Sequence, residues 1–208
     1  MLSRTPRSLR ERQTAATRKQ IVDVAMEMLT RHPAEPFTHE IIAKKAGMGA
    51  RTVYRYFPRR ANLMQVVWER IREETRTRFP SNEREVVVFA RTQFREFDKQ
   101  EAMVRASLAF SGSTEIRARG SLQGRPAFRK SLSHITAHVP PAERRRLIAV
   151  CLAIYSAPFW QLLRDRGELD GGEPGEAAAW ALQAVLSAAR SEVRRLRGKR
   201  KGKDSEEE

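Results

Sequence analysis

The sequence has a single cysteine and lacks any long apolar run. Cys151 is the only cysteine among 208 residues, so an intramolecular disulfide framework is excluded. Its apolar neighbours favour a buried, inert thiol over a redox role. No stretch approaches about 18 consecutive apolar residues, and the basic N-terminus is not followed by the apolar core of a signal peptide. We therefore expect a cytoplasmic protein without a membrane partner.

Patterns typical of catalysis and metal binding are also missing. We find no nucleophile elbow and no phosphate-binding glycine loop. His134 and His138 stand four residues apart on a predicted helix, a spacing that can place two imidazoles on one metal. No zincin glutamate or cysteine cluster accompanies them, so we interpret them as solvated or hydrogen-bonded. We expect no metal, no cofactor and no enzymatic activity.

Positive charge is abundant. The chain has 40 Lys and Arg against 25 Asp and Glu, which gives a formal net charge of +15 and a pI near 11.0. Residues 1–80 hold 17 basic and 8 acidic side chains, against 23 and 17 in the longer remainder. Such an excess fits a polyanion, either nucleic acid or an acidic membrane surface. Its density indicates that a nucleic-acid reader lies in the N-terminal part.

Hydrophobic periodicity is helical throughout, without a convincing strand or an internal repeat, so we predict an all-α chain. Residues 1–13 are interpreted as a flexible basic arm, which either lies along DNA or is an ordinary disordered terminus. A helix-turn-helix domain is predicted over 14–58 and a connecting helix over 59–80. We expect a ligand-binding and dimerisation domain over 81–197 and a disordered tail over 198–208.

Finer features of the C-terminal part are predicted from proline, glycine and alanine. A stretch rich in Gly and Ser after Phe110 predicts a loop, and residues 142–166 predict one long helix interrupted at Pro158. Alanines in the final helix, 176–197, permit close helix approach, so these last two helices are expected to form a twofold dimer interface. The alternative is intramolecular packing of the same faces. The interface candidates are Ala177, Trp180, Ala181, Ala184 and Ala188.

Two short predicted helices meet at a glycine turn in the N-terminal part. Thr38 is a good N-cap for the first helix, and Gly47 ends it. The second helix runs from about Gly49 to Phe57. Joined in this way, the pair predicts a helix-turn-helix, whose second helix enters the major groove. Short helices with a glycine turn also occur in ordinary bundles, so the pattern alone leaves both interpretations open.

A wider pattern surrounds this turn, and it consists of Phe37, Thr38, Ile42, Ala43, Ala46, Gly47, Thr52, Val53, Tyr54, Tyr56, Phe57, Pro58 and Leu63. With these residues, the segment of about 14–72 resembles the DNA-binding domain of the TetR family of repressors. The centre of the match, Arg51 to Pro58, is similar to the family's recognition helix and the turn after it. The resemblance implies an N-terminal three-helix helix-turn-helix domain joined to a C-terminal helical ligand-binding and dimerisation domain.

Arg51 is the leading candidate for reading a base, because a guanidinium can bind guanine through two hydrogen bonds. Gly49 and Ala50 depart from the polar residues usual in the family, although glycine permits close backbone approach and alanine can touch a thymine methyl. Specificity is therefore expected to depend on Arg51, Arg55 and DNA shape. The predicted DNA contacts are Thr38, Gly49, Ala50, Arg51, Thr52, Tyr54, Arg55, Tyr56, Arg59 and Arg60.

The resemblance places several of these contacts on phosphate or in the groove. Thr38, Thr52, Tyr54, Tyr56 and Arg60 stand where the family usually makes such contacts, and hydroxyls and phenols are competent phosphate donors. For Tyr54 the alternative is packing against the core of the domain. Val53 and Phe57 are predicted to be core residues.

The expected function is that of a homodimeric regulator, a repressor released from a palindromic operator in double-stranded DNA by a small apolar or amphipathic effector. The alternatives are a helical small-molecule-binding protein without DNA activity and, third, an enzyme on a helical scaffold. Large side chains at helical spacing are candidates for the effector cavity, with a filled core as the alternative. These candidates are Phe94, Met103, Ser107, Phe110, Phe128, Tyr155, Phe159 and Trp160.

Overall fold

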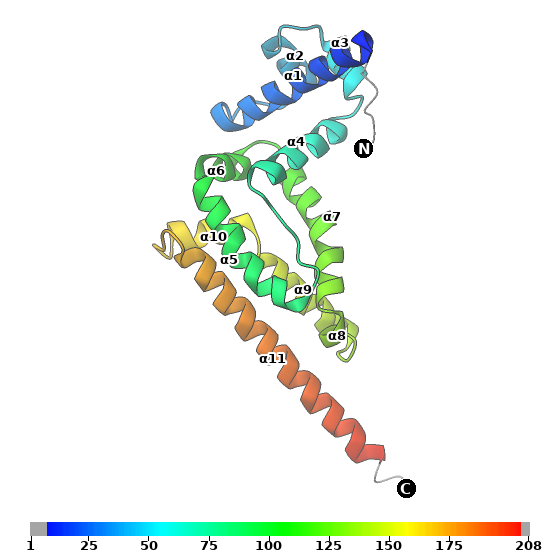
Figure 1. Cartoon of the computed structure of the whole chain (residues 1–208), viewed down its shortest axis with the longest axis vertical. Helices are drawn as coiled ribbons and strands as arrows, with labels where there is room; N and C mark the ends of the chain where they lie inside the picture. The colour runs from blue at the N-terminus through cyan, green and yellow to red at the C-terminus, as the bar shows by residue number, and fades with distance from the viewer. Residues whose placement is uncertain (1–7, 205–208) are drawn as a thin grey trace, which may run out of the picture. The chain divides into compact units, whose positions relative to one another are not determined.

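The computed structural model describes residues 8–204, and over this range the regular structure is helical with no strand (Figure 1). The predicted all-α fold class is therefore confirmed. The chain divides into two compact units. Within the described residues, the N-terminal unit comprises 8–71 and 105–117, and the C-terminal unit comprises 72–104 and 118–204.

The N-terminal unit begins with α1 (Leu9–Arg31), followed by α2 (His39–Lys45), α3 (Ala50–Tyr56) and the first part of α4 (Arg60–Glu74). Ser8 and Glu11 form a reciprocal capping box at the start of α1. Residues 9–13, predicted to be a flexible arm, are thus helical, because this box satisfies amides that a helix start leaves without partners. Residues 1–7 of the predicted arm lie outside the described residues.

The core of the N-terminal unit also receives the turn between α6 (Glu101–Ala109) and α7 (Ser113–Ser131). The ring of Phe110, 1% exposed, packs edge-on against Phe37 with the centroids 4.8 Å apart. A Cβ at Gly112 would lie 2.5 Å from the Phe110 ring, so the turn has room for glycine alone. A segment distant in sequence therefore completes the domain that carries α2 and α3.

In the C-terminal unit, α11 (Glu173–Asp204) runs beside α5 (Glu83–Lys99) (Figure 1). A Cβ at Gly175 would lie 2.9 Å from the carbonyl oxygen of Arg91, so the first turn of α11 rests directly on the α5 backbone. Next to this contact, Arg91 Nε donates to a carboxylate oxygen of Glu176 at 2.7 Å. The core beneath contains Phe94, Phe128, Leu132, Trp160 and Leu182.

The loop predicted after Phe110 was wrong, because Ser113–Ser131 form the helix α7. Gly124 and Phe128, one helical turn apart, are both buried. A Cβ at Gly124 would lie 3.0 Å from Leu152 Cδ2 and 3.1 Å from the Phe79 ring. Close packing on that side stabilises a helix whose glycine and proline content disfavours one in isolation.

The single bent helix predicted over 142–166 was also wrong. The structure has two helices, α9 (Pro141–Ile154) and α10 (Ala157–Asp165), with 56° between them. Ser156 caps α10 by accepting from the Phe159 amide, and Pro158 lies in its first turn. A proline there starts a helix well, since no intrahelical amide bond is lost. Pro158 therefore belongs to a helix start, and the break precedes it.

Three smaller features of the C-terminal unit are the short helix α8, the end of α11 and the buried Cys151. α8 (Ser133–Thr136) is a single turn after α7, and α11 extends to Asp204, so residues 198–204 of the predicted disordered tail are helical. The remaining tail, 205–208, lies outside the described residues. Cys151 on α9 is buried, and burial raises the pKa of its thiol to about 12, which agrees with an inert cysteine.

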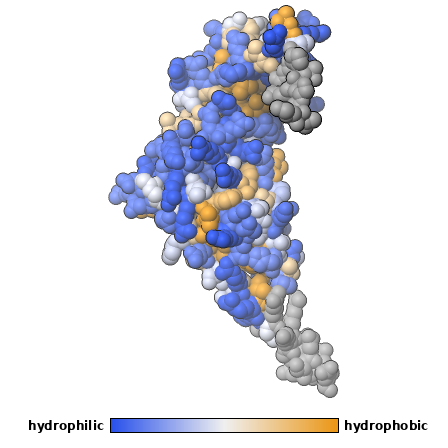
Figure 2. Space-filling model, viewed as in Figure 1, coloured by the Kyte–Doolittle hydropathy of each residue, from blue (hydrophilic) through white to orange (hydrophobic). Residues whose placement is uncertain are grey.

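Hydrophilic residues cover most of the face shown in Figure 2, interrupted by smaller hydrophobic patches. Within residues 8–204, no single helix is long and apolar enough to span a membrane. The bent pair α9 and α10 reaches the required length and composition only when both helices are taken together.

Candidate functional site

Local capping builds the turn between α2 and α3. The Thr38 side chain accepts from the Ile41 amide at 3.3 Å and so caps α2. At the other end of α2, the amide of Gly47 donates to Lys44 and that of Met48 to Ala43, which is a Schellman motif. This motif requires the left-handed φ of +64° that Gly47 adopts. The predicted helix-turn-helix is thus formed by α2, this turn and α3.

α3 has one anchored side and one open side. Val53 and the C-cap residue Phe57 are both 0% exposed, which confirms them as core residues. Arg51, Tyr54 and Arg55 are exposed on the same short helix. Because residues three and four apart share a helix face, these three side chains form one stripe on the open side. Two guanidinium groups and a phenol on a stripe suit contacts with base edges and phosphates.

Tyr54 is exposed but not free to rotate. Its hydroxyl donates to Glu40 at 2.7 Å, and its ring stacks on that of His39 with the centroids 4.5 Å apart. This hydrogen bond lowers the pKa of the Glu40 carboxyl and raises that of the Tyr54 phenol. The exposed position agrees with the surface alternative for Tyr54. Its proton is already donated, so a phosphate contact would have to displace Glu40 or use the ring.

His39, which the sequence analysis did not single out, ties α2 to α3. It is 7% exposed, and its Nε2 lies 2.8 Å from the carbonyl oxygen of Phe57. A carbonyl can only accept, so Nε2 carries the proton in this contact. The bond joins the first residue of α2 to the last turn of α3, and the stacked Tyr54 ring adds a second tie. No sequence motif signals it, because a single histidine at a helix start has many possible roles.

The other predicted DNA contacts occupy varied positions. Arg59 and the N-cap residue Gly49 are exposed, while Ala50 and Thr52 are half-buried on α3. Tyr56 is half-buried too, and a hydrogen bond with the Thr17 side chain lowers the pKa of its phenol. The Arg55 guanidinium lies 5.3 Å from the centre of the Tyr56 ring, within cation–π range.

Arg60 is 38% exposed at its side chain, and each nitrogen of its guanidinium lies near a protein oxygen. Nη1 donates to the carbonyl oxygen of Phe37, while Nε and Nη2 each lie 3.2 Å from Glu115 Oε1. The group also lies 5.5 Å from the centre of the Phe37 ring. The phosphate contact predicted for Arg60 stays a prediction, and such a contact would have to compete with these two protein oxygens.

The structure does not bring the predicted effector residues to one place. Phe110 and Ser107 are buried in the N-terminal unit. In the C-terminal unit, Phe94 and Trp160 both pack on Phe97, and the Trp160 indole donates to Asp98 at 2.8 Å. Rings and a satisfied indole are the features of a filled core.

The remaining candidates give a similar picture. Phe128 packs edge-on against Tyr155, whose hydroxyl donates to the carbonyl oxygen of Arg78 at 2.8 Å, and burial raises the pKa of this phenol. The polar group expected to hold a ligand therefore already has a protein partner. Met103 and Phe159 are half-buried.

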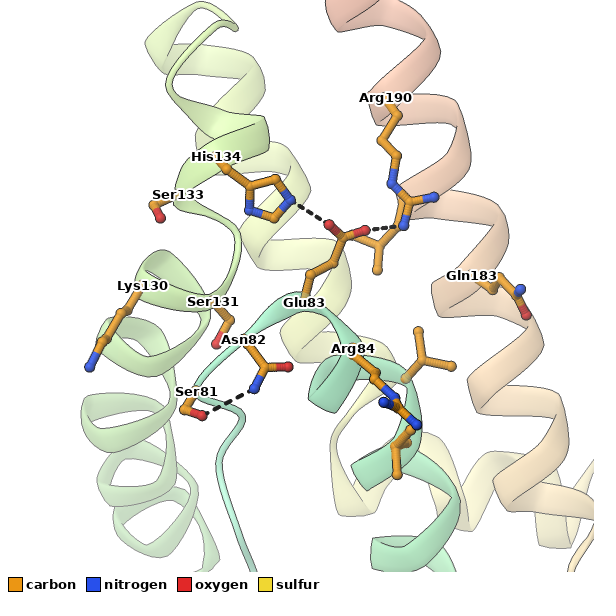
Figure 3. A pocket seen from close by; sticks show the side chains of 13 residues that line it. Ser81, Asn82, Glu83, Arg84, Lys130, Ser131, Ser133, His134, Gln183 and Arg190 are labelled. Atoms are coloured by element: carbon orange, nitrogen blue, oxygen red, sulfur yellow. Dashed lines mark hydrogen bonds and ion pairs between the residues drawn. The ribbon is translucent and has the colours of Figure 1, made fainter.

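A surface groove of about 770 Å³ lies elsewhere in the C-terminal unit, between the start of α5, the α7–α8 junction and α11 (Figure 3). At its centre Glu83 pairs with His134 Nε2 at 2.5 Å and with Arg190. His134 was paired in the sequence with His138 as a possible metal site, and the structure gives it a carboxylate partner instead. The full lining is Ser81, Asn82, Glu83, Arg84, Val87, Val88, Lys130, Ser131, Ser133, His134, Gln183, Leu186 and Arg190.

The dimer-interface candidates lie along α11. Trp180 is 74% exposed, Ala184 and Ala188 are exposed one and two turns further on, and Ala177 and Ala181 are half-buried. Positions 180, 184 and 188 share a face of the helix. A large indole left in water beside small residues is unusual for a closed surface.

The chain was compared with family models, curated proteins and solved structures. Residues 21–67 match the family model described as bacterial regulatory proteins, tetR family. A search of curated proteins finds no match. Among solved structures, a TetR-family transcriptional regulator from Streptomyces coelicolor shares the fold, with a TM-score of 0.52 and 20% sequence identity over 88% of this chain and 89% of the other.

The matched segment runs from the buried half of α1 through α2 and α3 to the middle of α4. It therefore contains the whole helix-turn-helix, including the Gly47 turn and the exposed stripe of α3. Residues 21–67 therefore form a DNA-binding domain of the TetR type, and the helical fold of the chain is that of a TetR-family transcription regulator.

Proposed function

We propose that this protein is a homodimeric repressor that binds a palindromic operator and is released from it by a small molecule. The observation that carries the proposal is the stripe on α3, where Arg51 and Arg55 are exposed while Val53 and Phe57 anchor the helix. A recognition helix needs this combination, since an anchored backbone is required to hold base-reading side chains in register.

Arg51 is the residue to which we assign base reading. It lies in the first turn of α3, and the N-terminal residues of a recognition helix are those that contact base edges. Arg59 is exposed just beyond α3 and is assigned to phosphate, together with the hydroxyl of Thr38, which keeps its own proton to donate while capping α2.

Dimerisation would use the exposed face of α11. Trp180 supplies a large apolar anchor, and Ala184 and Ala188 let a second copy approach closely. Two recognition helices related by a twofold axis read two half-sites about 34–36 Å apart along the DNA, so the operator should be a palindrome.

For the effector we favour the groove of Figure 3 over the aromatic core. Its volume of about 770 Å³ suits a small molecule, and Val87, Val88 and Leu186 offer apolar surface. Arg84 and Lys130 add positive charge at the same groove. A small amphipathic compound matches this lining. To act as an inducer, it must bind the DNA-incompetent state more tightly than the DNA-bound state.

Selection of bound fragments from genomic DNA, followed by binding measurements over a range of salt concentrations, tests the DNA-binding part. We expect a palindromic consensus and an affinity that falls steeply with salt. Transcription in vitro from a promoter containing that site should then decrease as protein is added. Absence of salt-dependent duplex binding would leave a helical small-molecule-binding protein as the function.

The effector part is tested by a thermal-shift screen and titration of each hit with and without operator. A true inducer must bind less tightly when operator is present, because coupling is reciprocal. Val88→Glu, on the groove, should abolish binding of the inducer, while Leu122→Glu, 67% exposed on α7 and outside the lining, should not. Retained binding in Val88→Glu would place the effector elsewhere.

A further inference from the structure

The α6–α7 turn and the first turn of α7 contact the segment that leads into the helix-turn-helix. The Ser111 amide donates to the Pro33 carbonyl and its hydroxyl to the Glu35 carbonyl, both at 3.2 Å. Glu115, in the first turn of α7, then receives Nε and Nη2 of Arg60. The chain before α2 is therefore tied to the α6–α7 turn at several points inside the N-terminal unit.

Arg60 extends these ties to the start of α2. Its Nη1 donates to the carbonyl oxygen of Phe37, the residue immediately before the N-cap Thr38. Phe37 is 2% exposed and is held on its other side by the edge of Phe110. Moving the Phe37 carbonyl would move Thr38 and with it the axis of α2, which packs directly against α3.

The chemistry of the guanidinium decides what else Arg60 can do. Its planar fork can serve a carbonyl and a carboxylate simultaneously, whereas an ammonium presents one compact charge. Nε and Nη1 donate to protein oxygens, and Nη2 lies within ion-pair distance of Glu115, so the guanidinium charge is already paired with a carboxylate. A phosphate approaching Arg60 would compete with these oxygens and would be repelled by the charge of Glu115.

We propose that Arg60 is a positioning residue, which sets α2 and α3 against the α6–α7 turn through Phe37 and Glu115, and that it does not contact DNA phosphate. Of the two measurements below, operator affinity rests on the proposed DNA-binding function, and amide hydrogen exchange does not. Glu115 is part of the same arrangement, because it binds the Arg60 guanidinium, which in turn donates to the Phe37 carbonyl.

The first readout is operator affinity as a function of salt for Arg60→Gln, Arg60→Lys, Glu115→Gln and the double variant Arg60→Gln/Glu115→Gln. Arg59→Gln is the matched control, since it removes the same charge from the exposed neighbouring position. We expect Arg60→Gln, Arg60→Lys and Glu115→Gln each to weaken binding about threefold to tenfold with an unchanged salt slope. The double variant should be no weaker than Arg60→Gln alone, because both substitutions break the same arrangement.

A phosphate contact predicts the opposite pattern. Arg60→Gln would then flatten the plot of log affinity against log salt by about 0.9, as Arg59→Gln should. Arg60→Lys would bind nearly as well as the wild type, and Glu115→Gln would bind as tightly or more tightly. Any of these results for Arg60 or Glu115 would overturn the proposal.

The second readout, amide hydrogen exchange without DNA, separates the positioning role from the proposed function. We expect faster exchange at Ile41–Ala43 in Arg60→Gln and Glu115→Gln, and wild-type exchange in Arg59→Gln. Glu115 is 44% exposed, so Glu115→Gln should stay folded even where Arg60→Gln unfolds the unit. Unchanged exchange in a folded Glu115→Gln variant would refute the positioning role, whereas a wild type that binds no operator would refute the proposed function alone.

Discussion

Each of the two units has an apolar core, but the polar contacts within them differ in place. In the N-terminal unit, polar ties decide how the reading helices lie: His39 to Phe57, Tyr54 to Glu40, and Arg60 to Phe37. In the C-terminal unit, aromatic rings pack on one another inside the core and their polar groups are paired there, as in Trp160 with Asp98.

This difference has a functional meaning. Hydrogen bonds are directional and fix an orientation, which the base-reading surface proposed for α3 would need to within a fraction of an ångström. Apolar packing is less directional, which suits the effector response proposed for the C-terminal unit. Four substitutions, taken from the largest expected effect to the smallest, test the contrast.

Trp160→Ala should lower the free energy of unfolding by about 3–5 kcal/mol. The side chain is fully buried, so its loss leaves a cavity and removes the hydrogen bond to Asp98. Denaturant unfolding followed by circular dichroism measures the loss. The control Leu122→Ala, at a 67% exposed position, should change stability by less than about 0.5 kcal/mol. Similar small losses in both would show that the aromatic core is not what stabilises this unit.

Ala184→Arg should give a folded monomer whose operator affinity is lower by about 100-fold, since the two half-sites are then bound independently. Ala184 is exposed, so an arginine meets no clash within one copy of the chain. Sedimentation velocity reports the oligomeric state, and circular dichroism confirms the fold. A variant that sediments as a dimer would move the interface away from this face of α11.

Arg51→Ala should weaken operator binding by about 1–3 kcal/mol and relax the preference at one base pair. Arg59→Ala should instead weaken binding to all sequences alike and flatten the salt dependence. Binding to a set of single-base operator variants distinguishes the two. Uniform weakening by Arg51→Ala would assign it to the phosphate backbone.

Tyr54→Phe should have the smallest effect, visible as a rise in the pKa of Glu40 toward its ordinary value. In the wild type the hydrogen bond lowers this pKa, so its contribution is present above the unfolded pKa and is lost as the pH falls through the folded pKa. The stabilities of wild type and variant should therefore converge in acid and separate near neutral pH. Titration of the Glu40 carboxyl by nuclear magnetic resonance, compared between the two proteins, checks the shift directly.

The contrast between the units also explains which features could be predicted from the sequence. The Gly47 turn, the Thr38 cap and the buried Val53 and Phe57 follow from short-range chemistry, and the structure has each of them. The helical state of α7 could not be predicted locally, because it depends on Phe79 and Leu152 packing against Gly124.

Individual contacts of the reading domain were hidden for the same reason. The partners of Arg60 and of Phe37 lie at Glu115 and Phe110, more than 50 residues further along the chain. The position of Trp160 between Phe97 and Asp98 likewise joins residues about 60 apart, so a list of large side chains at helical spacing did not separate a cavity from a filled core.

The bond from His39 to Phe57 has a mechanical consequence. It closes a ring of chain that begins at the first residue of α2 and returns from the end of α3, and the Gly47 turn lies within that ring. A closed ring of this size resists hinge bending between its two helices. Under the proposed function, an effector signal that reached this domain would displace the helix pair as one rigid body, and it would change the spacing of the two recognition helices while each pair kept its own shape.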